Sequence, residues 1–220
     1  MIKLYTGTPG SGKSLHIAER IYYTLRAGRP VIGNFSIDLE KIHKKKKDKL
    51  KYTEVDNLEL TPTFLINYSR KYFGDRRIKE DEILLVIDEA QIIFNARDWQ
   101  RTNSKKDENG IGWLQFYSQH RKYGFEVVLV AQFDGMIDRQ IRSLVEYEYK
   151  HRKLSNFGLV GKIMSFLFFG KVFCAVAYWY PIGERLGADW FIAKRKIYEI
   201  YDTYKDYGVS KVLQPGDKKE

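Results

Sequence analysis

Apolar residues along the chain follow two patterns, short continuous runs and runs with helical spacing. Continuous runs are typical of strands buried on both faces of a parallel sheet, and helical spacing places apolar side chains on one face of a helix. Strands are predicted at residues 30–35, 83–87 and 127–131, and a further short strand is predicted at 2–6, where apolar and polar residues alternate. Helices are predicted at residues 14–27, 61–74, 113–123 and 137–145, and a further helix begins at 90–94. This alternation predicts an α/β fold with a parallel sheet flanked by helices.

The pattern weakens after residue 150, so we expect a core at residues 1–150 and a small β-rich extension at 151–220. Residues 157–182 are rich in apolar side chains, but Lys162 and Lys171 divide them into pieces too short to span a bilayer. A β-hairpin turning near Gly170-Lys171 is favoured, and a membrane-lying or re-entrant segment is the alternative. A final strand is expected at 193–203 and a polar tail from about residue 214.

Composition indicates the size of the core, the distribution of charge and the redox compartment of the protein. The 220 residues are 44% hydrophobic, enough for one sizeable core. The net charge is +10, and +6 of it lies in residues 41–51, which hold seven lysines and one aspartate. Such a run usually forms a solvated loop, and contact with nucleic acid or anionic lipid is the alternative. Cys174 is the only cysteine, which indicates a buried apolar residue in a reducing, cytosolic protein.

A phosphate-binding loop follows the first strand. Residues 7–14, GTPGSGKS, match the pattern G-x-x-x-x-G-K-S between a predicted strand and a predicted helix. Glycines let successive backbone N–H groups turn toward phosphate oxygens, and the helix N-terminus adds positive charge. Lys13 is expected to reach the β- and γ-phosphates of ATP, and Ser14 to ligate Mg²⁺. The predicted nucleotide contacts are Gly7, Thr8, Pro9, Gly10, Ser11, Gly12, Lys13, Ser14 and Leu15.

Polar residues follow the two later buried strands. Asp88 comes directly after residues 83–87 and is expected to hold Mg²⁺ beside the phosphate loop. Glu89 is expected to orient the attacking water, a role that a hydrolase needs and a small-molecule kinase does not. Gln132 follows residues 127–131 and is expected to sense the γ-phosphate.

An arginine finger completes the predicted catalytic set. Such a residue stabilises charge on the transferred phosphoryl group. Arg142 is the preferred candidate, and Arg121 and Arg139 are alternatives. The four histidines, His16, His43, His120 and His151, show no metal-ligand spacing, so no metal besides Mg²⁺ is predicted.

The motif order resembles a known family. The segments GTPGSGKS, VIGNF, ILLVIDEAQ, QHRKYGFEVVLVAQ and IDRQIR, within residues 1–145, resemble the zonular occludens toxin-like ATPases of filamentous phages and prophages. The resemblance implies a RecA/ASCE-like P-loop ATPase related to the FtsK and HerA pumps, working as a ring, commonly a hexamer. It also implies Glu89 as the catalytic glutamate, Gln132 as the sensor and Arg142 as the family arginine.

The function implied by the resemblance is phage assembly. Family members of this kind act at the cytoplasmic face of the inner membrane and drive extrusion of virions around single-stranded DNA, which makes coat and export proteins the expected partners. Many members continue into a transmembrane helix and an exported domain, to which toxin activity is attributed, and the sequence is expected to lack both. The alternatives are a helicase or conjugation-type ATPase, a small-molecule kinase, and a non-enzymatic nucleotide-gated scaffold.

Overall fold

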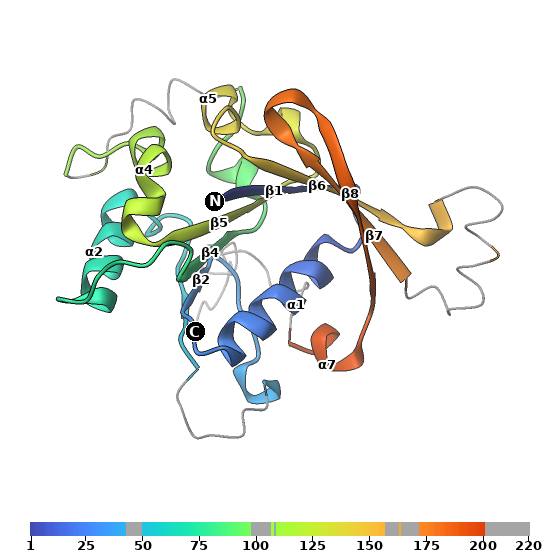
Figure 1. The fold of residues 1–220 in the computed structure, drawn as a ribbon, viewed down its shortest axis with the longest axis horizontal. Coiled ribbons are helices and arrows are strands. Elements are labelled where there is room, and N and C mark those ends of the chain that lie inside the picture. Colours follow the sequence, from blue (N-terminus) through green and yellow to red (C-terminus); the bar gives the residue numbers. More distant parts are fainter. Residues whose placement is uncertain (43–49, 98–106, 108, 157–162, 164–171, 201–220) are drawn as a thin grey trace, which may run out of the picture.

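One eight-stranded sheet runs through the described residues of the computed structural model, which are 1–42, 50–97, 107, 109–156, 163 and 172–200 (Figure 1). The strands lie in the order β3-β2-β4-β5-β1-β6-β7-β8. Pairing is parallel from β3 to β6 and antiparallel for β6–β7 and β7–β8. The strands are β1 (Ile2–Thr6), β2 (Val31–Gly33), β3 (Tyr52–Glu54), β4 (Ile83–Ile87), β5 (Phe125–Val130), β6 (Tyr147–Lys153), β7 (Val172–Trp179) and β8 (Glu184–Ile192).

Helices cover both faces of the sheet. The α-helices are α1 (Lys13–Arg26), α2 (Pro62–Phe73), α4 (Trp113–Gln119), α5 (Arg139–Arg142) and α7 (Arg195–Tyr198). Short 3-10 turns are η1 (Leu39–Lys41), η2 (Ala90–Ile92), η3 (His120–Tyr123), η4 (Asp134–Met136), η5 (Leu154–Asn156) and η6 (Tyr180–Ile182). Figure 1 shows α1 and α7 together on one side, and α2 with α4 on the other.

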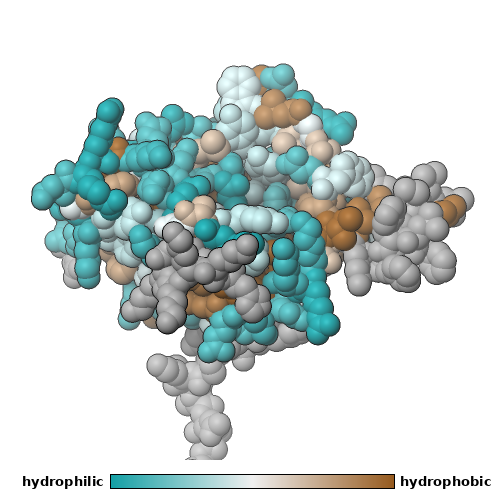
Figure 2. Space-filling model, turned by 60° about the horizontal axis from the view of Figure 1, so that its bottom comes forward, coloured by the Kyte–Doolittle hydropathy of each residue, from teal (hydrophilic) through white to brown (hydrophobic). Residues whose placement is uncertain are grey.

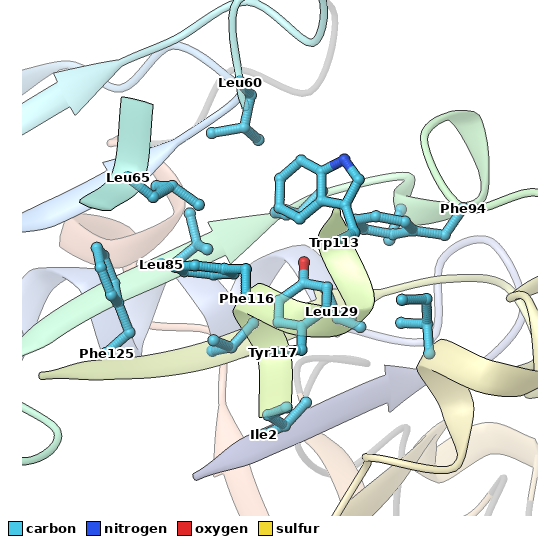
Figure 3. Packing of buried hydrophobic residues seen from close by; sticks show 14 of the residues in the cluster. Ile2, Leu60, Leu65, Leu85, Phe94, Trp113, Phe116, Tyr117, Phe125 and Leu129 are labelled. Atoms are coloured by element: carbon cyan, nitrogen blue, oxygen red, sulfur yellow. The ribbon is translucent and has the colours of Figure 1, made fainter. Parts of the chain in front are cut away.

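The core is two layers because successive residues of a strand point to opposite faces. In β4, Ile83, Leu85 and Ile87 pack with α2, α4 and α5, whereas Leu84 and Val86 pack with α1 and α7. An aromatic group fills the first layer: Figure 3 shows Trp113 and Tyr117 of α4 beside Phe94, and Phe116 packs on both α4 rings. β4 is therefore apolar on both faces, which is why its sequence is a continuous apolar run.

Most elements predicted from continuous runs and helical spacing are confirmed. The four predicted strands correspond to β1, β2, β4 and β5, and the first two predicted helices correspond to α1 and α2. Thr61 caps α2 by accepting the Phe64 N–H at 3.1 Å. Gly124, expected to close the helix that begins at Trp113, has a φ of 75° after the turn η3. Cys174 is buried and free.

Three predictions of local structure are wrong. Where a helix was expected to begin at 90–94, Ala90–Ile92 form only the 3-10 turn η2. Within residues 137–145 only the single turn α5 is helical, and the side chain of Asp138 caps it by accepting the N–H groups of Gln140 and Ile141. Of the strand expected at 193–203, residues 201–203 lie outside the described part, and Arg195–Tyr198 form the short helix α7 instead. Ile197 and Ile200, three residues apart, are both buried in the α1 layer, and helical spacing brings them to one face.

The strands β3, β6 and β8 were not predicted. The buried side chains of β6 include Glu148 and His151, so its burial does not follow apolar residues. β8 is an edge strand with mostly exposed side chains. The hairpin formed by β7 and β8 turns at η6, whereas the predicted turn at Gly170-Lys171 lies outside the described residues. β6 runs across residue 150, so one sheet extends over both predicted regions.

Two predicted surface features also fall outside the described residues, namely most of the lysine run (43–49) and the polar tail. Within the described part of the chain, none of the helices has both the length and the apolar character needed to cross a bilayer. The face seen in Figure 2 is largely hydrophilic, with its apolar areas separate from one another.

Candidate active site

The phosphate loop joins β1 to α1. Gly7 and Gly12 have φ values of 146° and 97°, a region that residues with a side chain rarely adopt. Gly12 is the N-cap of α1, so the loop ends where the backbone N–H groups of the helix point outward. This geometry is suited to binding phosphate oxygens.

The ammonium of Lys13 lies over its own loop. Its Nζ donates to the carbonyl oxygen of Gly7 at 2.6 Å and to that of Thr8 at 3.3 Å. Burial lowers the pKa of Lys13, and the nearby negative charges of Glu89 and Asp88 oppose that shift. The charge of Lys13 therefore interacts with both carboxylates that are expected to share its site.

Asp88 and Glu89 directly follow β4, which places them at the same edge of the sheet as the phosphate loop. Asp88 is only 5% exposed. Asn34, directly after β2, binds the main chain of Asp88 on both sides: its Oδ1 accepts the Asp88 N–H at 2.7 Å, and its Nδ2 donates to the Asp88 carbonyl at 2.8 Å. Asp88 in turn accepts the Glu89 N–H at 2.9 Å through Oδ1. The position of the acidic pair is therefore fixed by a neighbouring strand.

Glu89 has a left-handed backbone, with a φ of 47°. Non-glycine residues adopt this conformation at a cost and mainly where the surrounding structure enforces it, often at functional sites. The Gln91 side-chain amide donates to Glu89 Oε2 and so orients the carboxylate. Neither Asn34 nor Gln91 was among the site residues expected from the sequence. A polar residue directly after β2, beside the acidic strand, was the available signal for Asn34.

Gln132 follows β5, the strand between β1 and β4. Its carbonyl oxygen accepts the Gly7 N–H at 2.9 Å, which ties the start of the phosphate loop to the end of β5. Gln132 and Thr8 line one cleft of about 470 Å³, together with Glu148 and Lys150 of β6. The sensor candidate and the phosphate loop are therefore direct neighbours.

The three candidate arginines lie in different places. Arg142 Nη1 is 3.8 Å from Asp134 Oδ2, and Asp134 also lines the cleft. Arg121 pairs with Glu146, which accepts the Ile2 N–H at the amino end of β1. The phosphate loop lies at the other end of that strand, roughly 17 Å away at about 3.3 Å per residue. The structure brings Arg142 near the cleft and does not bring Arg121 there; Arg139 is exposed on α5.

The residues present fit a magnesium ion held together with a nucleotide. Hydroxyl and carboxylate oxygens are the donors that Mg²⁺ prefers, and it usually takes one or two of them plus phosphate oxygens. Ser14, in the first turn of α1, and buried Asp88 supply that donor set. Among the described residues, no three or more His, Cys, Asp or Glu side chains gather as a metal-binding group.

Comparison with known proteins identifies the family. Residues 1–170 match the family described as "Zonular occludens toxin (Zot)". The chain belongs to the Zot family. It is 26% identical to the Gene 1 protein of Enterobacteria phage I2-2, over 97% of this chain and 59% of that protein. Identity to the Gene 1 protein of Enterobacteria phage fd is also 26%, over 96% and 63%. The chain thus spans about three-fifths of the length of these relatives.

Solved structures show the fold of this Zot family member. The N-terminal domain of zonular occludens toxin from Neisseria meningitidis matches with a TM-score of 0.51 and 19% identity, over 91% of this chain and 98% of that one. The genome-packaging NTPase B204 of Sulfolobus turreted icosahedral virus 2, solved with ATP-gammaS, matches with 0.50 and 17%, over 88% and 96%. The predicted P-loop NTPase fold is confirmed.

Proposed function

We propose that this chain is an ATP-hydrolysing motor for assembly and export of filamentous phage, with single-stranded DNA or the virion as cargo. The observation that carries the proposal is the adjacency of three strand ends. The phosphate loop follows β1, Gln132 follows β5, and Asp88-Glu89 follows β4, and these strands are neighbours in the sheet. Ligands in open α/β sheets bind at the carboxyl ends of the strands.

Each residue has a role that follows from its chemistry. Lys13 and the N–H groups of the loop bind and neutralise the β- and γ-phosphates of ATP. Ser14 and Asp88 would hold Mg²⁺, which supplies further positive charge at the phosphates. Glu89, oriented by Gln91, positions and polarises the attacking water. Gln132 is hydrogen-bonded through its carbonyl to Gly7, so a change at the γ-phosphate can reach the end of β5.

The proposed working form is a homo-oligomeric ring. Substitution of Arg142 tests whether one subunit acts on the active site of its neighbour. The Arg142 guanidinium pairs with Asp134 within one chain, and its side chain is 26% exposed. We infer that it stabilises phosphoryl charge in its own site or a neighbour's. If Arg142→Ala keeps ATP affinity and loses turnover, that role is supported. Loss of turnover when the variant is mixed in excess with wild type would support action on the neighbouring subunit.

The proposed setting is the cytoplasmic face of the inner membrane, with coat or export proteins as partners. Residues 41–51 carry +6, and polybasic segments are attracted to anionic lipid surfaces. Flotation with vesicles of neutral and anionic lipid tests this part alone. Binding to anionic vesicles that is lost when the lysines of residues 41–51 are replaced by glutamine would support it, and equal binding to neutral vesicles would contradict it.

A DNA-translocating helicase or conjugation-type ATPase is the second candidate. The chain's overall charge of +10 favours a polyanionic partner, and its fold is similar to that of a viral genome-packaging NTPase. The two candidates differ in what stimulates hydrolysis. The ATPase rate should be measured against oligomeric state, with and without single-stranded DNA. Strong stimulation by DNA in the absence of coat protein would favour the second candidate, and a monomer at every concentration with ATP would contradict the ring.

A further inference from the structure

The phosphate loop touches β6 at one end and β7, which pairs antiparallel with β6, at the other. A β-carbon placed on Gly7 would lie 2.7 Å from the carbonyl oxygen of His151 in β6. One placed on Gly12 would lie 2.6 Å from Cδ1 of Phe173 in β7. Both distances are shorter than van der Waals contact allows, so the loop backbone packs directly on β6 and on the Phe173 ring. No side chain fits in either gap.

A histidine pair, half-buried His16 and buried His151, joins α1 to β6 beneath the loop. His16, two residues after Ser14, has its Nδ1 2.8 Å from Nε2 of His151. Nδ1 of His151 faces two carbonyl oxygens, those of Thr6 at 3.1 Å and Tyr149 at 2.9 Å. Carbonyl oxygens only accept hydrogen bonds, so the His151 Nδ1 must donate. In a neutral ring Nε2 then accepts, and His16 Nδ1 is the donor to it.

Aromatic rings enclose this hydrogen bond. His16 stacks on Tyr5 of β1 with ring centroids 4.8 Å apart and packs on Phe191 of β8 at 4.9 Å. Phe191 in turn stacks on Phe173 at 5.8 Å. His151 is 3% exposed. The hydrogen bond between the two histidines links α1 to β6, and the rings packed around it restrict the ways in which the two elements can shift.

We propose that His16, His151 and Phe173 are positioning residues for nucleotide binding, holding the phosphate loop in its binding conformation from β6 and β7. This inference rests on the proposed ATPase function. Gly7 and Gly12, the first and last glycines of the loop, pack against β6 and β7 respectively. The helix that carries Lys13 and Ser14 is hydrogen-bonded to β6 through His16 and His151. Loosening these contacts lets the loop sample conformations that do not bind phosphate. Apparent affinity then falls in proportion to the competent fraction.

The test separates positioning from stability by comparing KM with kcat. Phe173→Leu loosens the contact with Gly12, and Phe116→Leu makes the same chemical change in the aromatic group of the other layer, which does not touch the loop. His16→Phe keeps the ring and removes the hydrogen bond, and His16→Asn restores an N–H donor near the position of Nδ1. Each variant is assayed for steady-state ATP hydrolysis with Mg²⁺ and for thermal unfolding.

We expect Phe173→Leu and His16→Phe to raise KM for ATP about tenfold with kcat nearly unchanged, because saturating ATP repopulates the competent loop. His16→Asn should bring KM back toward the wild-type value. Phe116→Leu should lower the unfolding temperature and leave KM unchanged.

Two results would overturn the inference. If Phe173→Leu and His16→Phe have the KM of wild type and are merely less stable, as Phe116→Leu is expected to be, the contacts are structural only. If His16→Phe does not fold, the comparison of Phe173→Leu with Phe116→Leu decides. A wild-type chain that neither binds nor hydrolyses ATP would overturn the proposed ATPase function itself. Failure of the proposed function is thus seen in the wild type, whereas failure of the positioning inference is seen only in the variants.

Discussion

The two halves of the sheet achieve order by different means. The parallel strands β1, β2, β4 and β5 are buried mainly through apolar residues, and all five residues of β4 are both apolar and buried, although β1 and β5 also bury Lys3 and Glu126. The strand β6 is ordered in part by polar partners: Glu148 accepts the Thr6 hydroxyl at 2.7 Å, and His151 binds His16. The chemistry-bearing loops follow β1, β4 and β5. The strands β6, β7 and β8, which pair antiparallel with one another and form the antiparallel half, support the phosphate loop from the side. Changes in the first half should therefore remove ATP binding or turnover, and changes in the second should weaken affinity and stability by smaller amounts.

The largest effect is expected from Lys13→Ala in the parallel half. Removing the ammonium takes away the charge that faces the phosphates, and we expect ATP binding and hydrolysis to be abolished. Lys13 also hydrogen-bonds Gly7 and Thr8, so the variant should be checked for folding by circular dichroism. Equilibrium binding of a fluorescent ATP analogue measures the loss. A folded variant with wild-type affinity would show that the loop does not bind nucleotide.

A smaller effect is expected from Asn34→Ala, which tests whether a neighbouring parallel strand fixes the acidic pair. The change leaves the buried N–H and carbonyl of Asp88 without the Asn34 amide, at a cost of about 1–3 kcal/mol for each group. We also expect turnover to fall about 100-fold, because a shift of about 1 Å at a catalytic group can cost that much. Chemical denaturation and steady-state assays measure the two losses. An unchanged turnover number would mean that Asp88 keeps its position without Asn34.

The smallest effect is expected from pH, acting on the antiparallel half. Burial lowers the pKa of His151 to about 4 from an ordinary value of 6.5, against the opposing effect of the Thr6 and Tyr149 carbonyls. The folded chain therefore keeps His151 neutral where the unfolded chain binds a proton. Its contribution to stability is complete above pH 6.5 and declines as the pH falls from 6.5 toward 4.

The control for the pH prediction is His151→Asn, which cannot titrate. Denaturant unfolding of both proteins at about pH 7, 6 and 5 should show a steeper loss of unfolding free energy in the wild type. His16 of α1 and the charge of Lys13 face His151 and are common to both proteins. Identical slopes in the two proteins would contradict the role given to His151.

The sequence predicted β1, β2, β4 and β5 because most of their buried residues are apolar. The run at 83–87 and the phosphate-loop motif each point to one structure, and Asp88, Gln132 and Gly7 lie together as parallel strand ends require. β6 was missed because its buried positions include Glu148 and His151, whose burial depends on partners far along the chain. Asn34 and Gln91 were missed for the same reason, since their roles are hydrogen bonds that only the fold reveals.

The roles of Asp88, Glu89, Gln132 and Arg142 remain predictions that rest on placement. The structure adds their supports: Asn34 for Asp88, Gln91 for Glu89, the Gly7 N–H for Gln132 and Asp134 for Arg142. These contacts show which supporting residues can be substituted to test the position of each motif residue. They also place the antiparallel strands against the nucleotide loop, which no motif indicated.

The central claim, that the site hydrolyses ATP with Glu89 positioning the water, is tested most directly by Glu89→Gln. The substitution keeps the size and hydrogen-bonding capacity of the side chain and removes its charge. ATP affinity and ATP turnover should be measured on the same preparation. We predict wild-type affinity and a turnover reduced by at least about 100-fold, since a positioned general base contributes about 10²–10⁴ in rate. Hydrolysis at the wild-type rate would contradict the account.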